Sequence, residues 1–492
     1  MSSPLQALEP QPIWSHFDAI RQVPRPSKHE ERIAEHVRTW AAEHGFAVRA
    51  DTTGNLVVTV PASPGHEKAD LVVLQAHLDM VCEKNAGVEH DFMNEPIRVT
   101  VEGDWVKAVG TTLGADNGLG AAAAMAVAVD PEVVHGPLEL LFTLDEETGL
   151  NGASALDPAI VTGRVLINLD TEEDDAVYIG CAGAAGIEGV FSFERSAEPG
   201  AGELVELAVT GLRGGHSGMD IIENRGNASK IAARLLVAAT EAGVDVGLIA
   251  FAGGSKRNAI ARECFVQLRL EVAARQRLEE LAAVLRDELM AELGAIEPQL
   301  SIELRQAPSD APSWGPIAEA DRDRLLQVIL ATPHGVLTLS REVPGLVETS
   351  NNLAVVTVDE SEATLLCSLR SSVTPALTGT LQTLRSLFRL AGGQISEEAG
   401  YPGWKPNPES PVVRRTVAAY TELFGEPPAI KAVHAGLECG ILSEKIPGLD
   451  AVSIGPEIRN AHSPDEKARI SSSARFYRLL KRLLADLATT QV

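Results

Sequence analysis

A histidine and an aspartate two residues apart, His77 and Asp79, follow an apolar stretch at residues 71–76. Residues two apart in a strand point to the same face, so the two side chains can meet. Asp79 can then accept the second ring N–H of His77, which sets the tautomer while the other nitrogen faces a metal ion. An H-x-D pair by itself is more often a structural hydrogen bond than half of a metal site, so the pair needs partners elsewhere in the chain.

Acidic residues follow two further apolar stretches of strand length. Residues 138–144 lead into the acidic run 145–147, and residues 165–169 lead into Asp170. Open α/β sheets place their functional sites at the carboxyl-terminal ends of such strands. We therefore expect these side chains to gather with His77 at one edge of a sheet.

Two loop segments carry residues of the same kind. Asp116 lies in the glycine-rich stretch 114–120, which runs into an alanine-rich helix expected over residues 119–129. The stretch has neither a Lys-Ser/Thr ending nor G-x-G-x-x-G spacing after a strand, so a phosphate-binding loop is not predicted. Its glycines instead permit close approach of the backbone around Asp116. His462 follows a strand expected at residues 451–454.

Together these segments supply two imidazoles and four carboxylates, from His77, Asp116, the pair Glu146 and Glu147, Asp170 and His462. Zn²⁺ binds such a mixture of nitrogen and oxygen ligands, whereas Ca²⁺ and Mg²⁺ prefer oxygen alone. The ligand number fits two metals about 3.5–4 Å apart, with one bridging carboxylate and a shared position for water. A spare glutamate can then take a proton from that water. Mn²⁺ or Co²⁺ fits the same ligands.

The composition excludes several classes of partner. Lys and Arg number 42 against 68 Asp and Glu, a formal charge of −26, so nucleic acid and anionic membranes would be repelled. The five cysteines form no C-x-x-C pair, and the beginning of the chain has neither a basic start nor an apolar core. No apolar run reaches membrane-spanning length. We therefore expect a cytoplasmic protein that has no disulfide framework.

The order of expected elements assigns the 492 residues to the α/β class and divides them into two domains. Residues 1–188 and 398–492 are predicted to form one discontinuous domain, a mixed sheet flanked by helices. Residues 189–397 are predicted to form an inserted α+β domain. Two cycles of strands and helices within it, at 204–304 and 316–391, suggest two similar halves.

Seven motifs, taken in order along nearly the whole chain, resemble those of the di-zinc aminoacylase/carboxypeptidase-type metallopeptidases. Within that family they are similar to the cytosolic aminoacyl-histidine dipeptidases. As an ordered set the motifs are highly specific. They are Gln75-Ala76-His77-Leu78-Asp79-Met80-Val81, Leu113-Gly114-Ala115-Asp116-Asn117-Gly118, Asp145-Glu146-Glu147-Thr148-Gly149, Leu169-Asp170, Gly214-Gly215-His216-Ser217-Gly218, His434-Ala435-Gly436-Leu437-Glu438-Cys439-Gly440 and Ala461-His462-Ser463-Pro464.

The resemblance implies a role for each residue of the metal site. Asp116 would bridge two zinc ions. His77 and Asp170 would complete one site, and Glu147 and His462 the other. The family's bridging aspartate is commonly followed by a cis peptide, so the bond after Asp116 is a candidate for one.

Further roles follow from the same resemblance. Asp79 would orient His77, and Glu146 would be the general base that activates water and later protonates the leaving amine. The inserted domain would act as a lid, and its His216 would help to stabilise the negative charge that develops on the carbonyl oxygen.

For the two ends of a dipeptide the candidates are Glu438, facing the ammonium, and Arg370 with Asn258, facing the carboxylate. The expected function is metal-dependent hydrolysis of small peptides, namely dipeptides of the Xaa-His kind such as β-alanyl-histidine. Two alternatives stay open: an N-acyl amino acid deacylase or carboxypeptidase with the same two-metal site, and a catalytically silent metal-binding relative. Both a monomer and a homodimer fit, because the histidine of the lid can act within its own chain or across a dimer.

Overall fold

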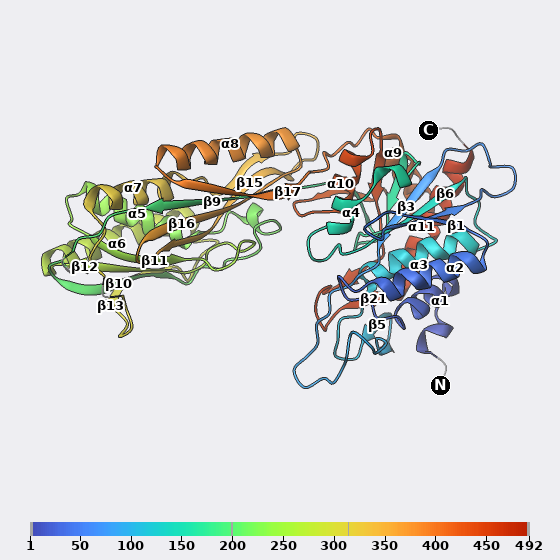
Figure 1. The fold of residues 1–492 in the computed structure, drawn as a ribbon, viewed down its shortest axis with the longest axis horizontal. Coiled ribbons are helices and arrows are strands. Elements are labelled where there is room, and N and C mark those ends of the chain that lie inside the picture. Colours follow the sequence, from blue (N-terminus) through green and yellow to red (C-terminus); the bar gives the residue numbers. More distant parts are fainter. Residues whose placement is uncertain (1–2, 198–199, 313, 490–492) are drawn as a thin grey trace. The chain divides into compact units, whose positions relative to one another are not determined.

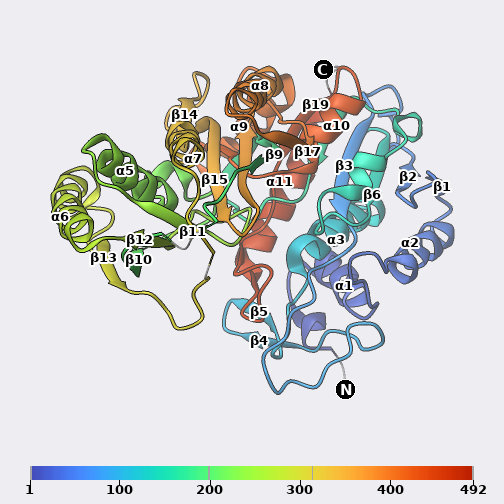
Figure 2. The same ribbon diagram turned by 60° about the vertical axis from the view of Figure 1, so that its left-hand side comes forward.

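The computed structural model describes residues 3–197, 200–312 and 314–489, drawn as ribbons in Figure 1 and Figure 2. The chain divides into two compact units. The first unit comprises Met1–Cys181, Trp404–Ala432 and Leu437–Val492, and the second comprises Ala182–Gly403 and Val433–Gly436.

The first unit is built on an eight-stranded mixed sheet with the order β1-β2-β6-β3-β7-β19-β8-β18. The central strands β6, β3, β7 and β19 run parallel to one another, so their carboxyl-terminal ends lie at the same edge. The strands are β1 (Ala47–Ala50), β2 (Leu56–Val60), β3 (Val72–His77), β6 (Leu138–Thr143), β7 (Val165–Asn168), β8 (Ala176–Cys181), β18 (Ala429–Val433) and β19 (Asp450–Ser453).

Every residue of β3, β6 and β7 is buried, which explains why these strands read as continuous apolar runs rather than as alternating ones. The alanine-rich helix α3 packs on β3 and β6, α9 packs on β19 and β8, and α11 packs on α9. The helices of this unit are η1 (Pro4–Ala7), α1 (Gln11–Ile20), α2 (Glu31–Glu43), α3 (Ala115–Val129), α4 (Asn151–Ala155), η2 (Pro158–Ile160), α9 (Pro411–Phe424), α10 (Glu438–Lys445) and α11 (Ile470–Thr489).

A small antiparallel sheet with the order β20-β21-β5-β4 also belongs to the first unit. It joins β4 (Val99–Glu102) and β5 (Trp105–Ala108) to the short strands β20 (Ile458–Arg459) and β21 (Lys467–Arg469). Because β20 and β21 pair with each other, residues 460–466 form the loop of a hairpin. This loop carries His462.

The second unit contains a nine-stranded sheet with the order β13-β10-β12-β11-β15-β16-β9-β17, and β14 pairs with β15. Helix α5 packs on β10, β11 and β12, while α8 packs on β9, β16 and β17 (Figure 2). The elements are β9 (Gly183–Ser192), β10 (Glu203–Thr210), η3 (Ile221–Glu223), α5 (Ala228–Glu241), β11 (Gly247–Gly253), β12 (Cys264–Leu270), α6 (Val272–Leu293), β13 (Ser301–Gln306), α7 (Glu319–Ala331), β14 (Gly335–Leu339), β15 (Val347–Val358), β16 (Glu362–Ser371), α8 (Thr374–Leu390) and β17 (Gln394–Tyr401).

The strand order of this sheet agrees with two similar halves. One half runs β10-α5-β11-β12-α6-β13 along the chain, and the other runs β9-α7-β15-β16-α8-β17. If the four strands of each half are numbered along the chain, their order across the sheet is 4-1-3-2 in both halves. The halves join where β11 pairs antiparallel with β15. The cycle predicted at 316–391 lacks β9, which is the first strand of the second half. In the chain, the whole first half lies between β9 and the remaining elements of the second half. None of the helices in the described ranges is long and apolar enough to cross a membrane.

Candidate metal centre

Side chains from five segments meet at the carboxyl-terminal edge of the central strands of the first unit. Two groups of three could each hold a metal ion, one of His77, Asp116 and Asp170, the other of Asp116, Glu147 and His462. Within each group the candidate ligand atoms lie within 4.8 Å of one another. Asp116 belongs to both groups.

The carboxylate of Asp116 presents one oxygen to each histidine. Its Oδ1 lies 3.2 Å from His77 Nε2, and its Oδ2 lies 3.2 Å from His462 Nε2. His77 Nε2 is also 3.4 Å from Asp170 Oδ1, and His462 Nε2 is 2.9 Å from Glu147 Oε2. The hydrogen bonds from His462 and His77 outweigh the effect of burial and hold the pKa of Asp116 below its usual range.

Local backbone structure sets these positions. His77 is the last residue of β3 and pairs in register with Thr143, the last residue of β6. Asp116 lies in the first turn of α3 with a non-helical conformation, and the Asp116–Asn117 peptide bond is cis, as expected from the sequence. His462, in the hairpin loop, has a positive φ of 62°.

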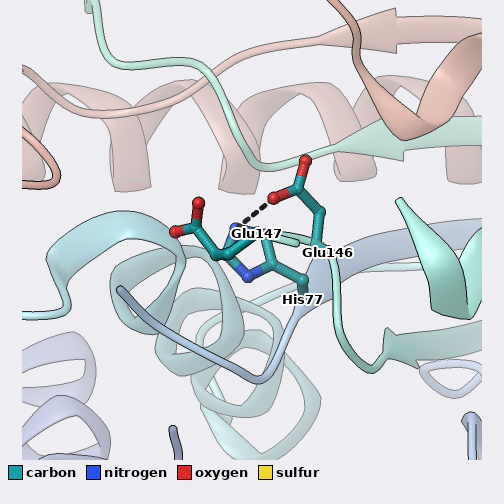
Figure 3. A group of neighbouring side chains, drawn as sticks. All are labelled: His77, Glu146 and Glu147. Atoms are coloured by element: carbon teal, nitrogen blue, oxygen red, sulfur yellow. Dashed lines mark ion pairs between the residues drawn. The ribbon is translucent and has the colours of Figure 1, made fainter. Parts of the chain in front are cut away.

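The carboxylates of Glu146 and Glu147 point away from each other beside the His77 ring, as Figure 3 shows. Glu146 Oε2 is 4.0 Å from His77 Nε2, and the three residues form a further cluster of candidate ligand atoms. Burial raises the pKa of Glu146 well above its usual value; His77 opposes the increase, and Asp170 adds to it. Glu146 therefore binds a proton more readily than an ordinary glutamate, which suits a group that serves first as base and then as acid.

Asp79 is fully buried and tied to the residues that it supports. Its Oδ1 lies 3.3 Å from His77 Nδ1 and accepts the backbone N–H of Glu146 at 3.0 Å. Its Oδ2 accepts the N–H of Glu147 at 3.1 Å and the hydroxyl of Ser27 at 2.8 Å. Burial favours a higher pKa, but the hydrogen bonds prevail and lower the pKa of Asp79 to about 2. The ionised carboxylate therefore positions both the histidine ring and the glutamate turn.

The donor set fits divalent cations. Among the described residues, Glu147 Oε1 and Asp170 Oδ1 are buried and have no hydrogen-bond donor. Burial raises the pKa of Asp170 to about 7 although His77 lowers it, and a bound cation would counter that increase. Buried carboxylate oxygens without donors, set among imidazole nitrogens, are the ligands expected at a zinc site.

Three residues near the cluster escaped the sequence analysis. Arg25 and Glu466 are each only 2% exposed, and they bind backbone groups around Asp116. Glu172 lies close enough to Asp116 and Asp170 that, after burial, these two carboxylates raise its pKa to about 8. The only sequence feature that could have indicated these residues is their closeness to proposed ligands. Glu172 follows Asp170 by two residues, and Glu466 follows His462 by four.

Glu438 is fully buried in the first unit. Its Oε2 accepts hydrogen bonds from Gln75 Nε2 at 2.6 Å and from Thr143 Oγ1 at 2.7 Å. Its Oε1 has no hydrogen-bond donor in the part of the chain that the structure describes. Burial raises the pKa of this carboxyl to about 7. The side chain is buried, and one of its two carboxylate oxygens keeps free capacity to accept a hydrogen bond.

The other predicted residues, His216, Asn258 and Arg370, belong to the second unit. His216 Nδ1 accepts the backbone N–H groups of Gly218 and Met219 at 3.2 and 3.1 Å. In the neutral ring the proton is then on Nε2, which becomes a hydrogen-bond donor. Burial and the positive charge of Arg370 lower the pKa of His216 and keep the ring neutral.

Arg370 and His216 approach each other at Gly218. A Cβ at Gly218 would lie 3.1 Å from both Arg370 Nε and His216 Cε1 and would also meet the carbonyl oxygen of His434. Asn258 lies beside this group in space, since its carbonyl accepts the N–H of Ser217 at 2.8 Å. Arg370 Nε and Nη1 are buried and have no acceptor among the described residues. Unpaired guanidinium donors beside a neutral imidazole suit a carboxylate ligand.

The mixed sheet and the paired clusters of candidate ligands that share Asp116 are the arrangement expected of a metallopeptidase. Residues 73–486 match the peptidase family M20/M25/M40, and the chain belongs to this family. The family is metal-dependent, so the metallopeptidase class predicted from the motifs is confirmed.

Two similar proteins extend over nearly the whole chain. The chain is 41% identical over 485 residues to the cytosol non-specific dipeptidase of Escherichia coli strain K12, covering 99% of each. It is 42% identical to an aminoacylhistidine dipeptidase from Vibrio alginolyticus, whose crystal structure superposes with a TM-score of 0.93 over 98% of each chain. The aminopeptidase PepT of Bacillus cereus shares the fold at 16% identity and a TM-score of 0.57.

Proposed function

We propose that the chain is a dipeptidase that works with two divalent cations, zinc ions by ligand chemistry, and that its substrates include Xaa-His dipeptides such as β-alanyl-histidine. The observation that carries the proposal is the carboxylate of Asp116, which offers one oxygen to each of two histidines. The names of the Escherichia coli and Vibrio proteins support a dipeptide substrate and differ on how strictly histidine is required.

In this proposal His77, Asp116 and Asp170 hold one cation, and Asp116, Glu147 and His462 hold the other. When bound, the cations supply Lewis acidity, which polarises the scissile carbonyl and lowers the pKa of water. Mn²⁺ or Co²⁺ can replace zinc at the same donors. The chain's own residues hold the cations and move the proton.

Glu146 is the general base of the proposed reaction. Its carboxylate takes a proton from the attacking water as the new C–O bond forms at the peptide carbonyl. It then gives that proton to the peptide nitrogen as the C–N bond breaks, which releases a neutral amine and a carboxylic acid that keeps the second proton of the water until it ionises. The raised pKa of Glu146 supports both steps, because the carboxylate must first accept a proton and then pass it on.

The second unit, residues 189–397 in the predicted division, is proposed to act as a lid that presents three residues to the substrate. His216 donates Nε2–H to the carbonyl oxygen as negative charge develops on it. Arg370 binds the substrate carboxylate, with Asn258 beside it. The free donors of Arg370 and the tautomer of His216 support these roles.

Glu438 enters the proposal in a changed role. The sequence suggested direct contact with the substrate ammonium, but the carboxyl is enclosed and bonded to Gln75 and Thr143. We propose that it acts from beside His77, as a buried negative charge that favours cations at the site.

The test combines metal analysis with a substrate panel. The purified protein should contain two divalent cations per chain and should hydrolyse free dipeptides, including β-alanyl-histidine. N-acetylated amino acids and longer peptides should be poor substrates, and a preference for an N-blocked substrate would instead favour the deacylase alternative. We also propose a cytoplasmic location, supported by the cytosol designation of the Escherichia coli relative. Light scattering distinguishes the monomer from the homodimer.

A further inference from the structure

The turn that carries Asp116 is bound by a buried carboxylate that is not one of the proposed ligands. Glu466 accepts the backbone N–H groups of residues 113–116: Oε2 takes the first two at 2.7 and 3.0 Å, and Oε1 takes the next two at 2.7 and 3.4 Å. N–H groups at the start of a helix have no partner inside the helix and favour an anion. Glu466 therefore holds all four amides that lead into α3.

A buried guanidinium binds the same turn from its carbonyl side. Arg25 Nη2 donates to the carbonyl of Gly114, and Nη1 donates to the carbonyls of Leu78 and Asp79 at 2.9 and 2.7 Å. Gly114 has a φ of +68°, and a Cβ there would lie 2.5 Å from Arg25 Nη2, so the turn requires glycine. Arg25 thereby ties the turn of Asp116 to the residues that follow β3.

Two opposite charges, Arg25 and Glu466, support this turn in the interior, and Asp79 also acts on Arg25. Arg25 and Glu466 are each 2% exposed, and a buried charge is tolerated when it is paired and hydrogen-bonded. Here each charge is satisfied by backbone groups around one turn. The pair therefore holds the turn while adding no net charge to the cluster of carboxylates beside it.

Glu466 also links this turn to the hairpin loop that carries His462. Both residues lie in the loop 460–466, and the N–H of Glu466 closes a turn by donating to the carbonyl of Ser463 at 3.0 Å. His462 itself faces Asp116 Oδ2. The carboxylate of Glu466 thus connects the turn that carries Asp116 with the loop that carries His462. These two residues are proposed ligands of the same cation.

We propose that Glu466, with Arg25 as its countercharge, is a positioning residue that aims Asp116 at both cations at once. Without Glu466 the turn of Asp116 and the loop of His462 lose their common support. The cation between Asp116 and His462 is then bound more weakly, whereas the other stays with residues at the ends of β3 and β7. This inference rests on the proposed two-cation site.

The test is Glu466→Gln, which keeps the shape of the side chain but replaces one acceptor oxygen with an NH₂ group that faces backbone N–H groups. Metal-free protein is titrated with Mn²⁺ by calorimetry, and electron paramagnetic resonance reports exchange coupling between adjacent Mn²⁺ ions. The wild-type chain should bind two Mn²⁺ and show the coupled signal. The variant should bind one Mn²⁺ with wild-type affinity and the second about 10–100-fold more weakly, the range for supporting residues, without the coupled signal.

Glu139→Gln is the matched control. Glu139 lies on β6 in the same unit, is 1% exposed, and accepts the backbone N–H groups of Thr162 and Gly163 at 2.9 and 3.0 Å. The control should lower the unfolding temperature in the same way as the test variant, yet bind two coupled Mn²⁺ ions. A loss of coupling in both variants would show a general structural effect and overturn the inference.

The outcomes separate the two proposals. A wild-type chain that binds fewer than two Mn²⁺ contradicts the two-cation function. A wild-type chain with two coupled ions, together with a Glu466→Gln variant that keeps both at unchanged affinity, overturns the positioning role alone. If Glu466→Gln does not fold, Arg25→Lys is measured instead, because it retains the charge but loses the guanidinium donors. That variant should also lose the second ion, and retention of both would overturn the inference.

Discussion

The two units present opposite chemistry from different kinds of sheet. In the first, parallel strands end together and deliver carboxylates and imidazoles to one edge, with Asp116 shared by two clusters. In the second, two similar antiparallel halves carry a guanidinium and a neutral imidazole, Arg370 and His216, around Gly218. The first arrangement suits cations and the second suits an anion. In the proposed reaction, a zwitterionic peptide undergoing metal-assisted hydrolysis uses both kinds of group.

The units also differ in how far their polar groups are already satisfied. Asp79 accepts three hydrogen bonds and lies beside the His77 ring, so it has little capacity left for a ligand. Arg370, in contrast, keeps two buried donors that no described residue accepts. Saturated groups support their neighbours, whereas groups with free capacity are those that a ligand completes. Variants of the residues around the metal cluster in the first unit should therefore alter kcat and metal binding, and variants of Arg370 in the second should alter KM.

Glu146→Gln should produce the largest change. The amide cannot take the proton from water, so kcat should fall about 10²–10⁴-fold, the usual contribution of a general base. Metal content and KM should stay near wild type, because Glu146 is assigned to neither cation. Steady-state kinetics and metal analysis check both points, and undiminished hydrolysis would remove Glu146 from its proposed role.

Asp79→Asn should come next. The amide keeps the volume but supplies an NH₂ group where the backbone N–H groups of Glu146 and Glu147 need an acceptor. We expect a loss of about 10–100-fold in metal affinity or kcat, as for other residues that orient ligands. The fold should be retained by circular dichroism. Full activity at limiting zinc would show that His77 needs no such support.

Arg370→Lys should have a smaller effect, confined to substrate binding. Lysine keeps the charge but loses the planar fork that pairs with a carboxylate, so KM should rise about tenfold with kcat and metal content unchanged. Arg385→Lys is the control in the same unit, since Arg385 is paired with Glu397 at the surface and such pairs contribute about 0–1 kcal/mol. A fall in kcat instead of a rise in KM would contradict the assignment of Arg370 to substrate binding.

Sequence reasoning predicted which side chains at strand ends lie together, and the structure brings these side chains into one cluster. An apolar run followed by His77, or by Asp170, is a local pattern, and parallel strands bring such ends together whatever the rest of the chain does. The resemblance to a peptidase family then ordered these residues, and the family match agrees with it. The strand order of the second unit likewise agrees with the two similar halves that the alternation of elements suggested.

The rest depends on contacts that no local pattern records. Arg25 and Glu466 bind backbone groups, which every residue type has. The residue types at the contacted positions therefore do not indicate these contacts. β20 and β21 are two and three residues long, too short to show a period. The enclosure of Glu438 follows from Gln75 and Thr143, which lie on neighbouring strands far from it in sequence.

The central claim is that Asp116 joins two cations into one working site, and reconstitution with zinc tests it most directly. Metal-free protein is titrated with Zn²⁺ while dipeptide hydrolysis and bound zinc are followed together. The account predicts that two Zn²⁺ bind per chain and that full activity requires both. Full activity with one equivalent, or hydrolysis that persists without metal, would contradict it.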